Sequence, residues 1–186
     1  TPLTRVMVYN TLARAMVALS SPGWEAHYYC SLDILSKTEP LDLARTYNYL
    51  LHGLLREGRL DEAEAVVCSL QSLPAMSEFS QWMLGFGRAD LACRRGTTWS
   101  DPGLDAMAQA EDVWGHALGF YLQATARQPG RSLSDATSRF QRARQLFLKD
   151  VAGGDAHNIL LFLAESMNVA TAAWNEPRAS MATSAS

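Results

Sequence analysis

Residues 45–70, with the sequence RTYNYLLHGLLREGRLDEAEAVVCSL, constrain the fold more than any other part of this chain. Apolar residues in the first half recur at spacings of three and four, which places them on one face of a helix. Gly58 is expected to end that helix, because glycine adopts the left-handed backbone conformation that follows many helices without steric cost. A second apolar stripe begins at Leu60. The segment therefore predicts two antiparallel helices joined by a tight turn.

The start of the second helix carries residues typical of a capping box. Asp61 is expected to accept hydrogen bonds from free amides of the first turn, and Glu64, three residues later, to reach back toward them. A hairpin of this size cannot bury both of its apolar stripes alone, so it requires neighbours of the same kind. We therefore expect an all-α protein built from packed helical hairpins.

The same residues resemble one pentatricopeptide repeat. The matching residues are the pair Tyr47-Asn48, the turn Gly58-Arg59-Leu60 and the helix start Asp61-Glu62-Ala63. A second copy begins upstream in the run Val8-Tyr9-Asn10-Thr11-Leu12, 38 residues before its counterpart, which is a repeat length typical of helical-hairpin solenoids. The resemblance implies a right-handed α-solenoid of antiparallel hairpins, similar to pentatricopeptide and tetratricopeptide repeat proteins, with about seven to nine helices.

We expect one helical-repeat domain over residues 1–176, with repeats at about 6–40 and 44–78, divergent hairpins at 79–176 and a flexible tail at 177–186. Proline and glycine punctuate helices expected at 3–19, 24–36, 41–57, 61–72 and 77–95. Asp101-Pro102 is typical of another helix start. Periodicity does not decide whether that helix runs unbroken to residue 127 or divides near Gly115, and we favour the single helix. Further helices are expected at 134–150 and 155–174.

Composition narrows the classes of function. The 186 residues are 48% hydrophobic and 19% charged, as in ordinary soluble helical domains. A formal charge of −3 argues against holding nucleic acid by bulk electrostatics. The three cysteines, Cys30, Cys68 and Cys93, are too widely spaced for a disulfide framework or a zinc knuckle, which indicates a reducing compartment. The chain opens at Thr1 without a signal peptide, compatible with a processed targeting presequence or a truncation, and no apolar run suits a membrane span.

The resemblance implies that the asparagine after the tyrosine of each repeat contacts RNA, which selects Asn10 and Asn48. In that family the residue closing the repeat helps to select the base, and those residues here are Leu43 and Glu78. Leucine cannot hydrogen-bond to a base, and glutamate repels phosphate. Two repeats are also few when each contacts one base. The plainer alternative is that both asparagines are solvent-facing helix residues.

Two further segments are candidate interaction sites. A run of basic residues between Arg127 and Lys149 is suited to a phosphate backbone or an acidic protein surface, although a solvated helix face has the same pattern. Its members are Arg127, Arg131, Arg139, Arg142, Arg144 and Lys149. The helix expected at 155–174 is apolar nearly all round, so we expect a partner to cover Leu160, Leu163 and Met167.

Nothing in the sequence indicates catalysis. Phosphate-binding glycine loops, a Ser-His-Asp arrangement and an HExxH sequence are absent as local motifs. His27, Cys30 and Asp33 recur at one-turn spacing, but three ligands do not complete a structural metal site. We therefore expect no enzyme activity, metal, cofactor or small-molecule substrate.

Three functional hypotheses remain. The resemblance implies a subunit of an organellar ribonucleoprotein such as the mitochondrial ribosome, located in the mitochondrial matrix and contacting RNA and neighbouring proteins. The alternative is a tetratricopeptide-like scaffold for other proteins, mitochondrial or cytoplasmic. A more distant alternative is a helical domain of a larger enzyme or regulator.

Overall fold

The computed structural model describes residues 1–37, 40–95, 101–112, 114–119, 138, 141, 142 and 145. Every regular element in these residues is a helix and none is a strand, so the all-α prediction is confirmed for them. The chain divides into two compact units, Thr1–Ser100 and Asp101–Ser186, which are described separately. The single domain expected over 1–176 stays a prediction.

The described part of the first unit contains five helices, and each begins and ends within one residue of its predicted bound. They are α1 (Pro2–Ala18), α2 (Trp24–Leu35), α3 (Pro40–Arg56), α4 (Leu60–Gln71) and α5 (Glu78–Arg94). Pro2 and Pro40 both occupy the first helical turn, where the missing amide hydrogen is not needed. Gly23 and Gly58 have positive φ angles of 80° and 74° in the turns before α2 and α4.

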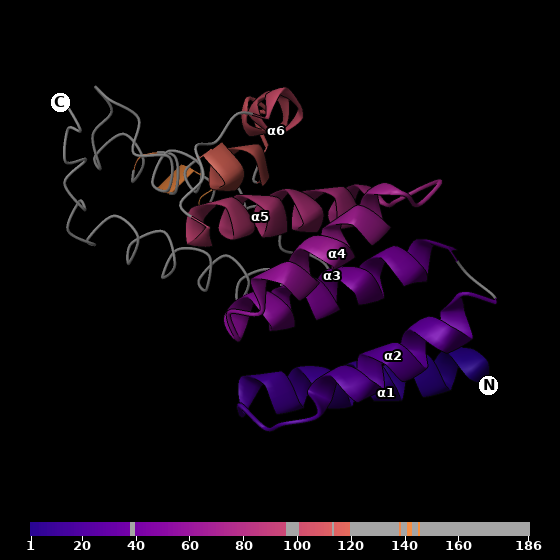
Figure 1. The fold of residues 1–186 in the computed structure, drawn as a ribbon. Helices are drawn as coiled ribbons and strands as arrows, with labels where there is room; N and C mark the ends of the chain where they lie inside the picture. Colours follow the sequence, from indigo (N-terminus) through magenta and orange to yellow (C-terminus); the bar gives the residue numbers. More distant parts are fainter. Residues whose placement is uncertain are drawn as a thin grey trace, which may run out of the picture. The chain divides into compact units, whose positions relative to one another are not determined.

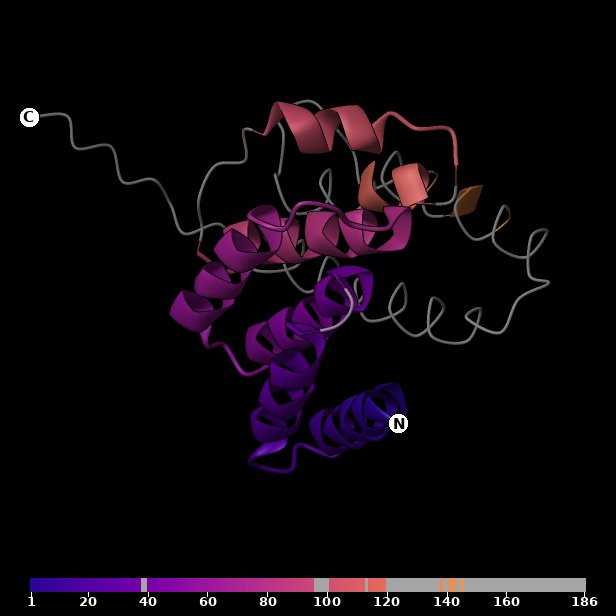
Figure 2. The same ribbon diagram turned by 90° about the vertical axis from the view of Figure 1, so that its right-hand side faces the viewer.

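Helix α3 lies at the centre of this unit. The chain runs along α1, returns along α2 and repeats this course in α3 and α4, so α1, α3 and α5 run in the same direction (Figure 1; Figure 2 gives the view at 90°). Helix α3 contacts α1, α2, α4 and α5. The helices that carry Tyr9 and Tyr47, α1 and α3, are therefore neighbours.

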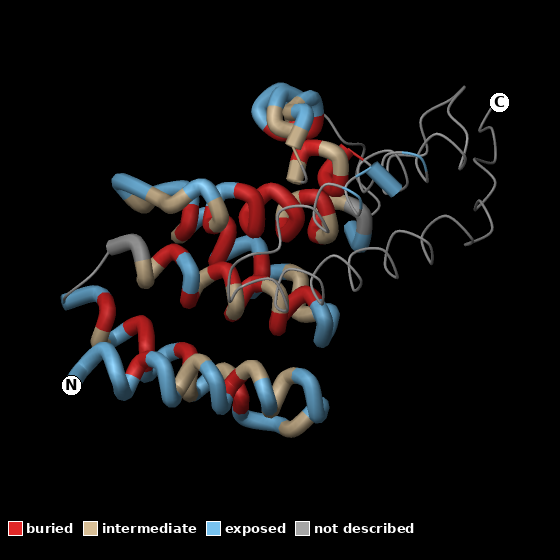
Figure 3. The backbone as a smooth tube through the Cα atoms, turned by 180° about the vertical axis from the view of Figure 1, so that it is seen from behind, coloured by how far each residue is buried: buried red, intermediate tan, exposed pale blue. Residues whose placement is uncertain are grey.

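The buried core follows from this central position. Leu50, Leu51, Leu54 and Leu55 of α3 are almost completely buried, because α3 has a helix on several sides (Figure 3). Burying a leucine side chain stabilises a fold by roughly 1.5–3 kcal/mol. The predicted apolar stripes of residues 45–70 therefore form the centre of the unit.

The turn between α3 and α4 confirms one prediction and corrects another. Gly58 has the predicted left-handed conformation, and its N–H donates to the Leu55 carbonyl oxygen at 3.0 Å. The predicted capping box is wrong, because α4 begins at Leu60, after an Arg59 cap that makes no side-chain capping bond. Asp61 and Glu64 instead pair with Arg95 beyond the end of α5, at 2.7 and 2.9 Å. The two carboxylates expected to cap the start of α4 thus form ion pairs with an arginine that follows α5.

The second unit begins with α6 (Pro102–Ala108), as predicted from its cap: Asp101 Oδ1 accepts from the backbone N–H groups of Gly103 and Leu104. The favoured single helix to residue 127 is wrong. Helix α6 ends at Ala108, residues 114–119 are helical again, and Asp112 Oδ1 accepts from the Gly115 N–H at 2.7 Å.

The remaining predictions for this unit are only partly covered. Residues 138, 141, 142 and 145, inside the helix expected at 134–150, are helical. The rest of that helix, the helix expected at 155–174 and the tail at 177–186 lie outside the described residues.

Candidate interaction surface

The two asparagines selected by sequence join neighbouring helices. Asn10 of α1 donates through Nδ2 to Thr46 Oγ1 of α3 at 2.9 Å. Asn48 of α3 donates through Nδ2 to the Ser80 carbonyl oxygen of α5 at 3.0 Å. Asn48 is only 1% exposed, so the alternative that it faces solvent is wrong, and a base has almost no surface of this side chain to contact.

Two glycines bring helices close together beside these bonds. A Cβ atom at Gly53 of α3 would lie 2.6 Å from Cη2 of Trp24, the first residue of α2. A Cβ atom at Gly87 of α5 would meet the Leu51 side chain of α3. Neither position has room for a larger residue, which explains why α3 and α5 keep these glycines despite a cost of roughly 1 kcal/mol each in a helix interior.

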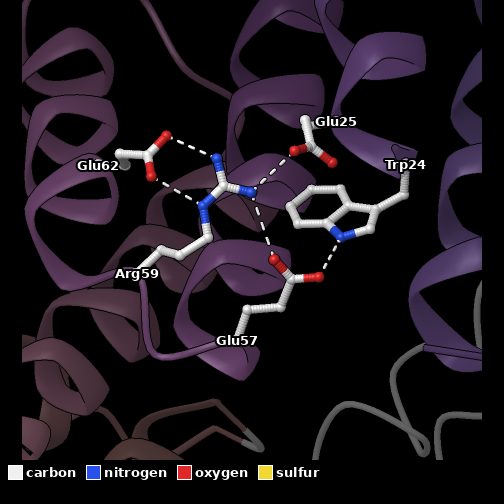
Figure 4. A network of polar contacts seen from close by, with 5 residues as sticks. All are labelled: Trp24, Glu25, Glu57, Arg59 and Glu62. Carbon is white, nitrogen blue, oxygen red and sulfur yellow. Dashed lines mark hydrogen bonds and ion pairs between the residues drawn. The ribbon is translucent and has the colours of Figure 1, made fainter. Parts of the chain in front are cut away.

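An ion-pair cluster closes the junction of α2, α3 and α4, and we call it the Arg59 cluster (Figure 4). The Arg59 guanidinium donates two bonds of 2.7 Å to the Glu62 carboxylate. It also donates to Glu25 of α2 at 2.9 Å and to Glu57 at 3.3 Å. The Trp24 indole N–H donates to the other carboxylate oxygen of Glu57. One arginine therefore connects the turn to the start of α2.

In the Arg59 cluster the pKa values of Glu25 and Glu62 are lowered and that of Arg59 is raised, so each of these groups is held in its charged form. A hydrogen bond from its own backbone N–H and the Arg59 guanidinium lower the pKa of Glu25, against the opposing effect of burial. Hydrogen bonds from Arg59 lower the pKa of Glu62. The carboxylates in return raise the pKa of Arg59 above its ordinary value. Glu25, Arg59 and Glu62 are therefore charged at neutral pH.

Aromatic side chains beside the Arg59 cluster connect α2 to α3 and α1. The buried Trp24 and Tyr28 rings of α2 meet edge to face, with centroids 5.8 Å apart. Tyr28 lies beside Tyr49 of α3, and the Arg14 guanidinium of α1 lies 5.0 Å from the Tyr49 ring centroid. Burial raises the pKa of Tyr28 above its ordinary range. These contacts connect the first three helices through one buried cluster.

Helix α1 exposes more large apolar side chains than any other helix among the described residues. Isolated exposed apolar residues are ordinary, but a group on one helix marks a candidate interaction surface. The exposed large hydrophobic residues of the first unit are Leu3, Met7, Val8, Leu12, Leu19 and Tyr29. Sequence analysis did not select them; the signal was there, since α1 carries apolar residues on more than one face.

Most of the other predicted interaction residues lie outside the described part of the chain. Arg142 is described, and it is helical and exposed. The predicted RNA-contacting residues Arg127, Arg131, Arg139, Arg144 and Lys149, and the predicted partner-contacting residues Leu160, Leu163 and Met167, are not among the described residues.

Metal and membrane sites were also sought. In the described ranges no group of three or more His, Cys, Asp or Glu side chains is arranged to hold a metal ion. No helix in the part of the chain that the structure describes is long and apolar enough to cross a membrane.

Comparisons with known protein families, with curated proteins and with solved structures found no match to this chain.

Proposed function

We propose that this protein is a non-catalytic helical-repeat subunit that holds other proteins in a larger assembly. In this proposal its hairpins stack as an α-solenoid of the pentatricopeptide and tetratricopeptide type. The observation that carries the proposal is that two asparagines at equivalent positions each donate to the next hairpin: Asn10 of α1 to the Thr46 hydroxyl of α3, and Asn48 of α3 to the Ser80 backbone carbonyl of α5. Repetition of a contact between successive hairpins is the defining property of a solenoid.

Three observations favour protein partners over RNA as the main ligand. Asn48 is buried against α5, the chain has a net charge of −3, and α1 exposes a group of apolar side chains. Phosphate backbones are bound by clustered cations, whereas exposed apolar groups bind proteins. A scaffold for proteins therefore fits the described residues better than a sequence-specific RNA binder.

Purification of the tagged protein from its native source, with and without ribonuclease, tests this proposal. We expect it to elute from a sizing column in a complex much larger than the monomer, and to keep that position after ribonuclease treatment. Elution as a monomer in both samples would contradict the proposal. Collapse of the complex on ribonuclease treatment would favour the RNA hypothesis.

The second candidate function is RNA contact inside an organellar ribonucleoprotein, which the repeat resemblance implies. It is supported by the exposed, helical Arg142 within the basic run at 127–149. An Arg142→Glu variant should then weaken RNA binding and reduce the salt dependence of the binding constant. Arg5→Glu on α1, which is also exposed, is the matched control. Equal RNA affinity of both variants and the parent would exclude this function for the basic run.

A further inference from the structure

Two antiparallel helix pairs in the first unit share one arrangement. A connecting loop joins α2 to α3 at one end of the first pair, and another joins α4 to α5 at one end of the second (Figure 1). At the opposite end of the first pair, Arg59 binds Glu25, the second residue of α2, at 2.9 Å. At the opposite end of the second pair, Arg95 binds Asp61, the second residue of α4, at 2.7 Å. Each arginine lies 34 residues after its carboxylate, so the same ion pair recurs at two successive junctions.

A buried ring supports the ion pair at the first junction. The side chains of Glu25 and Arg59 are only 27% and 30% exposed. Beside them Trp24, the first residue of α2, is 1% exposed, lies against Gly53 and donates to Glu57 (Figure 4). Burial of this ring holds the start of α2 on α3 even where the charges are screened by salt.

The ion pairs of the second junction are more exposed. We call Arg95 and its two partners, Asp61 and Glu64, the Arg95 clasp. The side chain of Asp61 is 98% exposed and that of Glu64 is 55% exposed. The first residue of α4, at the place of Trp24 in α2, is the half-buried Leu60. Dissolved salt can therefore screen the Arg95 clasp, and a half-buried leucine stands where the first junction has a buried ring.

Neutral contacts hold the other end of α5. Asn48 of α3 donates to the carbonyl oxygen of Ser80, the third residue of α5. The side chain of Leu51 lies where a Cβ atom at Gly87 would be. Residues 72–77 also join the end of α4 to the start of α5. Salt does not screen these contacts, so they keep the start of α5 in place while its Arg95 end is held by charge.

We propose that the junction of α4 and α5 is a salt-sensitive hinge, which opens at the Arg95 clasp and pivots at residues 72–77. The Debye length falls from about 10 Å at 0.1 M salt to about 3 Å at 1 M, so the exposed ion pairs weaken over this range. The junction of α2 and α3 stays closed over the same range because of Trp24. This motion needs no partner, so it goes beyond the proposed function and does not depend on it.

Distances between spin labels test the hinge. In the full chain, with Cys30, Cys68 and Cys93 replaced by alanine, labels are attached at Ala65→Cys of α4 and Ala92→Cys of α5, in the halves of the two helices nearer the Arg95 clasp. Pulsed electron paramagnetic resonance measures the mean distance between them. We expect this distance to lengthen by about 3 Å or more between about 0.05 M and about 1 M salt, because the ion pairs are screened.

Labels at Gln71→Cys and Gln81→Cys are the matched control. Both glutamines are exposed, and they lie on either side of residues 72–77. The distance between them should change by less than about 1 Å over the same range of salt. Lengthening of both distances would mean that salt loosens the unit as a whole and would overturn the proposal. An unchanged distance between positions 65 and 92 would overturn it too.

Variants of Arg95 separate the clasp from other effects of salt. Arg95→Gln should show the longer distance between positions 65 and 92 already at low salt, with less than about 1 Å of further change at high salt. Arg95→Glu combined with Asp61→Arg reverses the ion pair and should restore the shorter distance at low salt. A short distance in Arg95→Gln at low salt, or no recovery in the reversed pair, would overturn the proposal.

Discussion

The amide group of Asn48 makes a hydrogen bond through its nitrogen but none through its oxygen. Its Nδ2 group donates to the Ser80 carbonyl oxygen, while its buried Oδ1 has no hydrogen-bond partner among the described residues. An unpaired buried carbonyl costs roughly 1–3 kcal/mol, which offsets much of the bond made by the amide. The residue therefore fixes the position of α5 on α3 more than it stabilises the fold.

Substitutions at Asn48 should separate these two effects. Asn48→Ala removes the donor and the unpaired oxygen together, so we expect a loss of about 1 kcal/mol in the free energy of unfolding. Asn48→Asp places a carboxylate against the Ser80 carbonyl oxygen and should cost about 3 kcal/mol or more. Urea denaturation of the two variants measures the difference. Equal stability of the two would mean that Asn48 is not buried against α5.

The ion pairs of Arg59 should make the free energy of unfolding fall as the pH is lowered. The folded protein lowers the pKa values of Glu25 and Glu62, so the unfolded chain takes up protons first as the pH falls below 4.5, and stability is lost through the lowered pKa values. Arg59→Met should reduce the free energy of unfolding by about 1 kcal/mol at pH 7. The difference from the parent protein should shrink below pH 4.5 as the carboxylates are protonated.

Lys37→Met is the matched control, because the Lys37 ion pair with Asp33 is largely exposed on both sides. Exposed pairs contribute little, so its stability should follow that of the parent protein at every pH. Thermal unfolding between pH 2.5 and 7 would compare the three proteins. A constant difference between Arg59→Met and the parent over this range would show that the Arg59 cluster acts through packing alone.

At the scale of the elements, the approach of α2 to α3 depends on Gly53. Gly53→Ala places a methyl group against the Trp24 ring, and we expect a loss of about 1–3 kcal/mol from overpacking. Adding Trp24→Phe should recover part of that loss, since the smaller ring leaves room for the methyl group. A double-mutant cycle by chemical denaturation measures this coupling. Additive effects would mean that the ring does not rest on Gly53.

The helices of the first unit were predictable because their ends are encoded locally. Pro40 and Gly58 fix the bounds of α3 through backbone conformation, which needs no knowledge of the rest of the fold. The start of α4 was predicted one residue late with the wrong cap, because Asp61 lies inside the first turn of α4 and pairs with Arg95, which follows the end of α5. The helix break between α6 and residues 114–119 was missed because no proline marks it. The next helical segment begins where Asp112 Oδ1 accepts a hydrogen bond from the Gly115 N–H.

The candidate site was less predictable for a similar reason. Burial of Asn48 depends on α5, whose position no periodicity within α3 can give. The exposed face of α1 also emerged only by comparison with α3 and α5, because the three helices carry similar apolar residues and differ in what covers them. The spacing of apolar residues predicts which face of a helix is apolar. It does not predict whether another helix covers that face, and the proposed function depends on apolar faces that are exposed.

At the scale of the whole molecule, the division into Thr1–Ser100 and Asp101–Ser186 separates two sets of predictions. The first unit carries the repeat-like hairpins and the exposed apolar side chains of α1. The second carries the basic run at 127–149 and the apolar segment at 155–174. Protein binding and RNA contact, if both occur, are therefore assigned to different units, and variants at Leu12 and Arg142 should affect them independently.

The central place of α3 has a consequence for the order in which the first unit opens. Helix α3 is contacted by four helices, whereas α1 is contacted by α2 and α3 only. Amide hydrogen exchange reports the free energy of local opening, so α3 should exchange more slowly than α1, α2 and α4, each of which packs against two of the described helices. Exchange that is uniform from α1 to α4 would contradict this order. A protein bound to the exposed apolar side chains of α1 would then cover a helix that opens before α3, and its binding would raise the resistance of the whole unit to unfolding.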